Sequence, residues 1–320
     1  MKPPSAFITG IAGFAGSFLA EELLEAGWKV SGGLYKNEPL LNIRDIRREI
    51  TLCSLDISSP GRCRGVITRY KPDYIFHLAA MASVGQSFQK ERQTFDVNFG
   101  GTLNMLEAAR SHRRLTKFVL VSSADCYGIF TPRDKTLAED QPLRPVSPYG
   151  IAKAAAEHSG NYYYIRHGVP VTIARSFNHS GPRQSDNFVV PSFARQIARI
   201  EAGRQRPVIS VGDLSAKRDI SDVRDIVRGY RLIAEKGKEG EAYQLCSGKA
   251  WAIERILDQL VSMSEKSIKI AVDPARLRKV DIPCLRGNQS KAYKQVGFRT
   301  RYSIQETLKD TLDYWRANAT

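Results

Sequence analysis

Short apolar runs alternate with helical patterns along the first half of this sequence. Five runs bounded by polar or turn-forming residues are predicted strands: Ala6–Thr9, Lys29–Gly32, Tyr74–Leu78, Lys117–Ser122 and Val171–Arg175. Strands that alternate with helices are typical of a parallel sheet with a helix in each connection. The pattern therefore predicts an α/β fold.

Three helices in this half are predicted from apolar spacing and from terminal signals. Phe14–Ala26 carries apolar side chains on one face, and Gly27 follows it as a C-terminal cap. A second helix covers Phe95–Arg110 with similar spacing. A third begins at Ser147-Pro148, because serine is a favourable N-cap and proline fits the first helical turn.

The regular alternation of predicted strands and helices ends after about Phe177. Phe188–Ala202 and Asp222–Lys236 have helical patterns, Gly212–Arg218 is predicted to be a loop, and Ala242–Cys246 is predicted to be a strand. The remainder mixes helices with basic loops. This change predicts a second part of the chain with a different role.

The composition narrows the class of protein. With 42% hydrophobic and 25% charged residues, the chain of 320 residues is ordinary for a globular protein. It contains no apolar segment long enough for a membrane span or a signal-peptide core, so we expect a cytoplasmic protein. The five cysteines are dispersed, which argues against disulfides and against a zinc site, and we expect no metal. The net charge of +15 attracts anions such as nucleic acid, membranes or phosphorylated small molecules.

A glycine-rich turn directly follows the first predicted strand. Gly10, Gly13 and Gly16 recur at a spacing of three, and Phe14 opens the next helix. Glycine permits the tight turn and lets the backbone approach a pyrophosphate, while the helix N-terminus supplies free N–H groups and a positive dipole. The motif predicts a Rossmann-type doubly wound parallel sheet that binds a dinucleotide here.

This assignment divides the chain into two expected parts. Residues 1–175 are predicted to form the dinucleotide-binding domain, and residues 219–247 are predicted to return to it. Residues 176–320 are predicted to form mainly a smaller C-terminal α/β domain that binds the substrate.

The residues after the second predicted strand bear on the choice of cofactor. In many dinucleotide folds an acid about 20 residues beyond the glycine loop takes the ribose hydroxyls of NAD. Here Lys36 occupies that neighbourhood and no acid precedes Glu38. A cation suits a 2′-phosphate, so NADPH is predicted, with NADH as an alternative if Lys36 is an ordinary surface lysine. Asp56 is predicted to hydrogen-bond the adenine amine, or else to cap a loop.

Three residues suggest acid–base chemistry. Tyr149 and Lys153 are four residues apart in a predicted helix and therefore share a face. A nearby ammonium favours the phenolate, so the pKa of the tyrosine should be lowered toward the working range. Ser123 ends a predicted strand, at the carboxyl edge of the sheet where ligands bind. We predict that these three residues are catalytic.

These motifs, in this order, resemble the extended short-chain dehydrogenase/reductase family. The resemblance implies that Tyr149 is the acid/base, that Lys153 holds the nicotinamide ribose and that Ser123 binds the reacting oxygen. It also implies a homodimer formed through helices beside the Tyr149 helix. Further cofactor contacts that it implies are Ile57, Leu78, Ala79, Ala80 and Asn98.

The second half resembles the GDP-4-keto-6-deoxy-D-mannose reductases within that family. The resemblance is carried by the segments 175–182, 187–197, 218–223 and 273–278. It implies NADPH-dependent reduction of a GDP-sugar ketone at C4, which forms GDP-D-rhamnose, and it places Asn178 and Arg218 at the diphosphate. The full set of implied substrate contacts is Ser123, Asp125, Asn178, Val189, Arg195, Arg218, Arg276 and Arg278.

Two alternatives remain. A GDP-mannose 4,6-dehydratase, or another GDP-sugar 4-reductase or epimerase, is the nearer one. Dehydration needs an additional acid/base, and related dehydratases have Thr-Ser-Glu or Thr-Asp-Glu where this chain has Ser123-Ala124-Asp125, so reduction is favoured. The remote alternative is an inactive Rossmann protein that binds RNA through its positive charge. The three catalytic residues are present, so we expect no nucleic acid and no membrane as partner.

Overall fold

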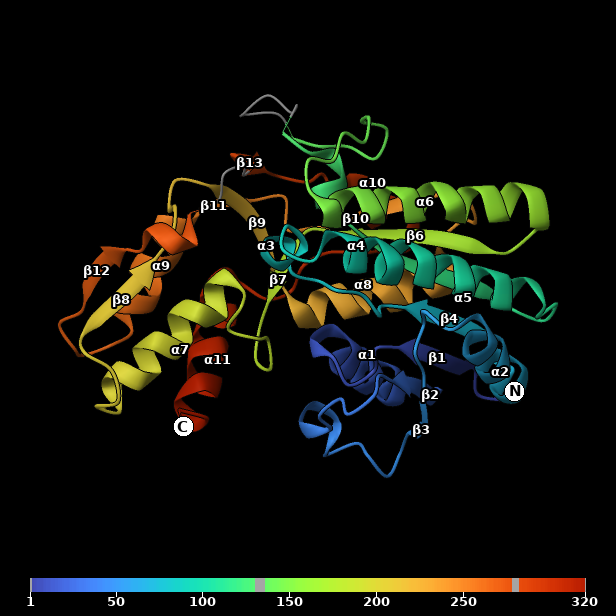
Figure 1. Cartoon of the computed structure of the whole chain (residues 1–320), viewed down its shortest axis with the longest axis horizontal. Helices are drawn as coiled ribbons and strands as arrows, with labels where there is room; N and C mark the ends of the chain where they lie inside the picture. Colours follow the sequence, from blue (N-terminus) through green and yellow to red (C-terminus); the bar gives the residue numbers. More distant parts are fainter. Residues whose placement is uncertain (1, 130–135, 278–281, 320) are drawn as a thin grey trace.

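The computed structural model of this chain describes residues 2–129, 136–277 and 282–319. Within these ranges, seven strands form a central sheet in the order β10-β6-β5-β4-β1-β2-β3, and every neighbouring pair is parallel (Figure 1). The strands are β1 (Ser5–Thr9), β2 (Lys29–Leu34), β3 (Thr51–Ser54), β4 (Tyr74–His77), β5 (Lys117–Ser123), β6 (Val171–Ser176) and β10 (Ala242–Leu245). The predicted Rossmann-type doubly wound sheet is confirmed.

The strand predictions succeeded where burial imposes an apolar run. All five predicted strands of the first half are present, and so is the strand predicted at Ala242–Cys246. We did not predict β3, which lies at the edge of the sheet and pairs only with β2. Its terminal residues Thr51 and Ser54 are exposed, so its sequence carries no continuous apolar signal.

Helices cover both faces of this sheet (Figure 1). Alternate side chains of a strand point to opposite faces: Ala6 and Ile8 of β1 enter one apolar core, and Phe7 enters the other. The first core is closed by α1 (Phe14–Glu25), α8 (Val223–Lys236) and α10 (Ser290–Val296). The second is closed by α2 (Pro60–Tyr70), α5 (Gly101–Arg110) and α6 (Pro148–His167), with the short helices α3 (Val84–Ser87) and α4 (Glu91–Phe95) beside α6.

The ends of the predicted helices follow their signals. Gly27 has a positive φ of 78° directly after the cap of α1. The Ser147 hydroxyl accepts a hydrogen bond from the Gly150 N–H at 3.0 Å and caps α6. The helix predicted over Phe95–Arg110 is a longer helical run, in which a π-helical turn at 96–100 joins α4 to α5.

A smaller unit lies beside the carboxyl end of the large sheet (Figure 1). Its helices α7 (Val189–Glu201), α9 (Ile253–Ser262) and α11 (Ile304–Ala317) share an apolar core with its strands. The loop predicted at Gly212–Arg218 ends two residues early, because β9 begins at Lys217. The strands of this unit are β7 (Asn178–Ser180), β8 (Val208–Val211), β9 (Lys217–Asp222), β11 (Ala250–Ala252), β12 (Lys269–Val272) and β13 (Cys284–Leu285).

Two elements from the second half of the chain pack with the first half. Strand β10 pairs with β6 at the edge of the large sheet, and α8 packs against α1. The chain thus leaves the sheet after β6 and comes back to it. Over the described ranges, every helix is too short or too polar to span a membrane.

The strand order reverses between β1 and β4, and this reversal creates a crevice. In such sheets the connections after the two neighbouring strands run to opposite faces, so ligands bind just beyond their carboxyl ends. Gly10 follows β1 and Ala79 follows β4. A Cβ atom on Gly10 would lie only 3.1 Å from the Ala79 Cα, so the two loops touch at the base of the crevice.

A buried histidine fixes the loop after β4. The Thr102 hydroxyl donates to the Asn98 carbonyl at 2.6 Å, so it accepts from His77 Nε2 at 3.1 Å. His77 Nδ1 then accepts from the Thr9 hydroxyl at 2.9 Å, and the Thr9 oxygen in turn accepts the Ala79 N–H at 3.0 Å. Burial, together with the smaller effect of the Lys153 charge, lowers the pKa of His77 to about 3, so the ring is neutral.

We predict that His77 makes the fold sensitive to acid. Its folded pKa lies below the unfolded value near 6.5, so the unfolded chain binds the extra proton and stability is lost as pH falls from about 6.5 toward 3. Between pH 7 and pH 5 the wild type should lose roughly 2 kcal/mol more unfolding free energy than His77→Gln, at about 1.4 kcal/mol per pH unit below the unfolded pKa. Urea titrations at the two pH values measure this difference, and equal losses in both proteins would contradict a neutral His77.

Candidate active site

The glycine loop is closely packed, as an anion-binding turn requires. Gly10 has a positive φ of 71°, and the Gly13 N–H donates to the Gly10 carbonyl at 3.1 Å. A Cβ on Gly16 would lie 2.1 Å from that same carbonyl oxygen, so no larger residue fits there. Helix α1 begins at Phe14, and the N–H groups of its first turn have no partner within the helix. This loop fits the pyrophosphate of a dinucleotide.

A large cavity of about 1670 Å³ opens over this loop. It runs from the carboxyl ends of β2 and β3, past β1, β4 and β5, to α7, β8 and β9 of the smaller unit. Single-ligand pockets typically occupy about 300–1000 Å³. The cavity therefore has room for a dinucleotide and a second ligand side by side.

The structure brings most of the predicted site residues together around this one cavity. Those that line it come from both halves of the chain and lie up to 266 positions apart, from Gly10 to Arg276. They are Gly10, Gly13, Phe14, Gly16, Asp56, Ile57, Leu78, Ala79, Ala80, Ser123, Asp125, Tyr149, Lys153, Asn178, Val189, Arg195, Arg218 and Arg276.

Two of the predicted residues do not line the cavity. Lys36 is exposed and does not line the cavity, whereas Tyr35 and Glu38 on either side of it do. Asn98 is buried behind the wall, where its amide oxygen accepts the Met81 N–H at 2.7 Å and its amide nitrogen donates to the Met81 carbonyl at 3.0 Å. It therefore holds a lining segment instead of reaching the cavity. Arg278 lies outside the described residues.

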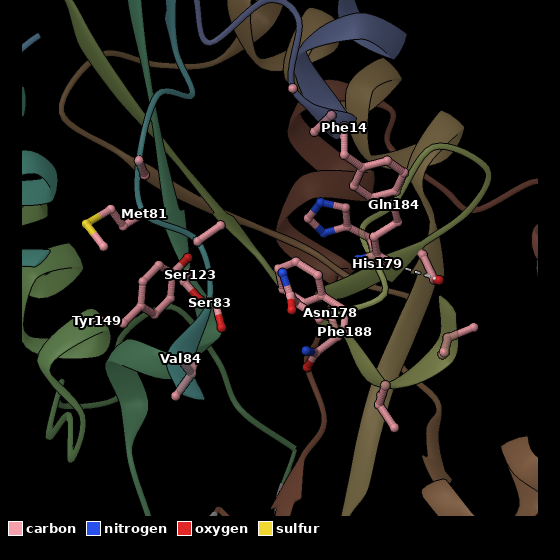
Figure 2. Close-up of a pocket in the computed structure, with 18 of the residues that line it drawn as sticks. Phe14, Met81, Ser83, Val84, Ser123, Tyr149, Asn178, His179, Gln184 and Phe188 are labelled. Carbon is pink, nitrogen blue, oxygen red and sulfur yellow. Dashed lines mark hydrogen bonds between the residues drawn. The ribbon is translucent and has the colours of Figure 1, made fainter. Parts of the chain in front are cut away.

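The predicted catalytic residues meet on one wall of the cavity. Figure 2 shows the Tyr149 ring next to Ser123, beside Ser83 and Val84 and away from His179. The Ser123 hydroxyl donates to the Asp125 carboxylate at 3.1 Å and accepts the Asp125 N–H at 3.2 Å. Strand β5 delivers Ser123 at its carboxyl end, and the first turn of α6 delivers Tyr149.

The electrostatics of Tyr149 correct our expectation. Burial raises the pKa of its phenol well above the usual value, and the Asp125 charge adds to this, while a hydrogen bond with Ser123 acts in the opposite direction. Burial also lowers the pKa of Lys153 to about 8. The Lys153 ammonium donates to the Val121 carbonyl at 2.8 Å. The predicted lowering of the tyrosine pKa is wrong, because desolvation and the Asp125 charge outweigh the hydrogen bond with Ser123, and the phenol stays protonated at neutral pH.

Basic side chains gather at the opposite end of the cavity. Arg195, Arg199, Arg218 and Arg276 all line it there. Arg218 is partly buried and donates to the Ile282 carbonyl at 2.6 Å, which holds its guanidinium against the wall. Such a group of arginines suits a ligand with several negative charges. Arg199 was not among the predicted residues, and nothing in its sequence surroundings distinguished it from a surface arginine.

A histidine joins the two halves of the site. His179, in β7, stacks on Phe14 at the start of α1, with ring centroids 5.8 Å apart and planes 12° from parallel (Figure 2). Its Nδ1 donates to the Phe177 carbonyl at 3.0 Å, and burial lowers its pKa. The stacking and the hydrogen bond indicate a structural role for this histidine.

Comparison with known proteins identifies the family to which this chain belongs. Residues 7–311 match the protein family described as GDP-mannose 4,6 dehydratase. The chain is 31% identical over 313 residues to the GDP-6-deoxy-D-mannose reductase of Pseudomonas aeruginosa, covering 97% of both chains. This chain belongs to the GDP-mannose 4,6 dehydratase family. The resemblance to extended short-chain dehydrogenases/reductases is thereby confirmed.

Two further similar proteins differ in the activity that their names state. GDP-mannose 4,6 dehydratase 1 of Arabidopsis thaliana is 28% identical over 325 residues, which cover 96% of this chain and 88% of that one. The solved structure of RMD from Pseudomonas aeruginosa complexed with NADPH superposes with a TM-score of 0.84 at 29% identity, over 98% of this chain and 99% of that one. Both a reductase and dehydratases are therefore similar along nearly the whole chain.

Proposed function

We propose that this protein reduces the C4 ketone of GDP-4-keto-6-deoxy-D-mannose to GDP-D-rhamnose, with hydride from NADPH. The observation that carries the proposal is the buried, protonated Tyr149 beside Ser123. Reduction of a ketone needs a proton donor at the forming hydroxyl, and a phenol with a raised pKa is in the donor state at neutral pH. The similarity to the Pseudomonas reductase supports the same reaction.

The cavity fits both ligands of this reaction. The backbone of the glycine loop is folded so tightly that a Cβ on Gly16 would collide with the Gly10 carbonyl oxygen. Such a tight turn fits the cofactor's pyrophosphate. When bound, the reduced nicotinamide supplies the hydride. Lys153 would hold the nicotinamide ribose, while Asn178 and Arg218 would hold the diphosphate of the sugar nucleotide.

Proton delivery then falls to this chain's own side chains. When substrate binds, the Ser123 hydroxyl would turn its one proton from the Asp125 carboxylate to the ketone oxygen and orient that oxygen toward Tyr149. The Tyr149 phenol would give its proton to that oxygen as negative charge develops there. Asp125 holds the Ser123 hydroxyl and keeps a negative charge near the phenol, which favours the protonated form before reaction.

One observation favours dehydration as the second candidate. Asp125 lies next to Tyr149 and could serve as the further acid/base that removal of the C6 hydroxyl needs. However, its carboxylate accepts the Ser123 hydroxyl, and its side chain is one carbon shorter than the glutamate of related dehydratases. This engagement supports reduction as the main activity.

The proposal includes a homodimer formed through α6. Tyr162 and Ile165 lie three residues apart on this helix and leave 56% and 82% of their surface exposed, so they form a small apolar patch on one face. A second copy of the helix could cover them. The small-molecule substrate remains the only other partner that we propose.

The reaction is tested directly with purified protein. With GDP-4-keto-6-deoxy-D-mannose and NADPH, we expect NADPH oxidation that depends on the sugar, and nuclear magnetic resonance should identify GDP-D-rhamnose. GDP-mannose alone should give no product. Conversion of GDP-mannose to the keto sugar without added NADPH would show that dehydration is the activity.

Tyr149→Phe should abolish most of the reduction while leaving the site intact. The change keeps the ring and removes only the proton donor, so the turnover rate should fall about 10²–10⁴-fold, as for general acid catalysis. The affinity for NADPH, measured by calorimetry, serves as the control and should stay within twofold. More than a tenth of the wild-type rate in a folded variant would mean that another group protonates the ketone.

Arg218→Met should weaken binding of the sugar nucleotide selectively. Loss of a charge-assisted contact at a partly buried site is worth roughly 2–3 kcal/mol, or about a 30- to 150-fold rise in the Kd for GDP. Binding of NADPH should change little, because that ligand rests on the glycine loop. The exposed Arg206, which does not line the cavity, gives the matched control Arg206→Met. Unchanged GDP affinity in Arg218→Met, or an equal loss for both ligands, would remove Arg218 from the diphosphate site.

A further inference from the structure

A short segment of the smaller unit rests directly on the helix that follows the glycine loop. It comprises residues 179–184, which form the end of β7 and the turn after it. The residues on either side of it, Asn178 before and Asn187 after, line the cavity where the sugar nucleotide is proposed to bind. Its contact partner, the start of α1, would receive the cofactor's pyrophosphate. The segment therefore touches one ligand site while its two ends belong to the other.

Arg183 makes the central contact between this segment and α1. Its guanidinium lies over the Phe18 ring, 4.5 Å from the ring centroid, and pairs with the Glu21 carboxylate at 2.8 Å. A longer hydrogen bond of 3.4 Å reaches the Ser17 hydroxyl. The side chains of Arg183 and Glu21 are only 21% and 24% exposed, so the pair is largely shielded from solvent. An ion pair that is shielded and stacked on an aromatic ring holds two elements together better than an exposed pair does.

The backbone of Arg183 is held in an unfavourable conformation. Its φ is +71°, in the left-handed region that residues other than glycine rarely occupy. Such a conformation persists only when the surrounding structure imposes it. Gln184 fixes the turn here: its amide nitrogen donates to the His179 carbonyl at 3.0 Å, and its amide oxygen accepts the Ser180 hydroxyl at 2.7 Å. This turn places Arg183 against α1 and Gln184 at the cavity.

A second contact lies one turn earlier on α1. The His179 ring stacks on Phe14, and both rings line the cavity on the side away from Tyr149 (Figure 2). Phe14 is the first residue of α1, so its N–H is among those left free for the pyrophosphate. A Cβ on Gly181 would lie 2.8 Å from the Val223 side chain, so the segment is also packed tightly against the start of α8.

We propose that Arg183 is a positioning residue that couples the two ligand sites, so that NADPH and the sugar nucleotide each strengthen binding of the other. A pyrophosphate bound at the start of α1 would immobilise the turn that carries Phe14. The segment then rests on a fixed surface, and Asn178 and Asn187 at its ends are held in place for the second ligand. Ordering that the first ligand has brought about need not be repeated for the second, and the effect is reciprocal by thermodynamic linkage.

The inference rests on the two ligands of the proposed function but gives Arg183 no contact with either. Arg183 does not line the cavity, so it acts only through the segment that it fastens. A purely structural role for the same contacts predicts a different result. In that case the loss of Arg183 would lower the stability of the protein, but one ligand would affect the other as before.

Two ligands that cannot react with each other measure the coupling. GDP carries no ketone, so calorimetric titrations give its Kd with and without saturating NADPH, and the ratio of the two values is the coupling factor. In the wild type, NADPH should tighten GDP binding at least about fivefold, the lower end of the usual range for coupled sites. In Arg183→Met the factor should fall below about twofold. Glu21→Gln breaks the same ion pair from α1 and should also lower the factor, and the double variant should lose no more than Arg183→Met alone.

Arg231→Met is the matched control. Arg231 of α8 pairs with Glu22 of α1 at 2.8 Å, and the two side chains are 23% and 19% exposed. This pair also holds α1 against a neighbouring element, but it lies outside the segment 179–184. The variant should keep the wild-type coupling factor.

The outcomes separate the proposal from a structural role. A wild-type factor below about twofold, or a factor that Arg183→Met leaves unchanged, would overturn the proposal. So would an equal loss in Arg231→Met, because the effect would then come from general loosening around α1. Each factor compares one protein with itself, so a uniform loss of affinity cancels.

A second measurement needs no sugar nucleotide. With NADPH alone, amide hydrogen exchange in residues 184–189 should slow at least about threefold in the wild type but not in Arg183→Met, while the first turn of α1 is protected in both. Protection of α1 without any effect on residues 184–189 in the wild type would overturn the coupling. Failure of GDP to bind at all would instead refute the proposed substrate, and the exchange result would still decide the role of Arg183.

Discussion

The site depends on one steric constraint, the contact between the loops that follow β1 and β4. Because all seven described strands of the sheet run in parallel, their carboxyl ends meet at one edge, and the strand order reverses there between these two strands. Gly10 and Gly16 let the backbone fold so closely that a single Cβ would collide with a carbonyl oxygen. The hydrogen bonds of Thr9 and His77 fix the second loop against the first.

Near that contact, burial controls the pKa values of Tyr149 and Lys153. A tyrosine and a lysine on one helix face suggest mutual stabilisation of their charged forms, yet both lie in the interior and each loses solvation. Desolvation raises the pKa of Tyr149 and lowers that of Lys153, in each case toward the neutral form. A neutral phenol can donate a proton, which is the role that the proposed reduction asks of Tyr149.

Positive and negative side chains line different ends of the cavity, in addition to the excess of positive charge on the whole protein. The net charge of +15 is a property of the chain, but the arginines that line the cavity belong to α7, β9 and the segment after β12. The opposite end, beyond β2 and β3, carries carboxylates. The stacked Phe14 and His179 rings lie where the two regions join.

The sequence alone determined the features that depend on local backbone chemistry. The glycine loop, the buried parallel strands, the Ser147 cap and the order of Ser123, Tyr149 and Lys153 could all be predicted, because each requires particular residues at fixed spacing. Tertiary structure decided what depends on surroundings. The edge strand β3 lacks an apolar run. Asn98 lies behind the cavity wall and holds the lining residue Met81, and Arg199 reaches the other arginines only through the folding of α7. The spacing predicted that Lys36 contacts the cofactor, but the turn after β2 places Glu38 at the cavity instead. Desolvation raised the pKa of Tyr149, which we had expected to be lowered. Burial and charge environment are properties of the packed interior, so the sequence alone did not reveal them.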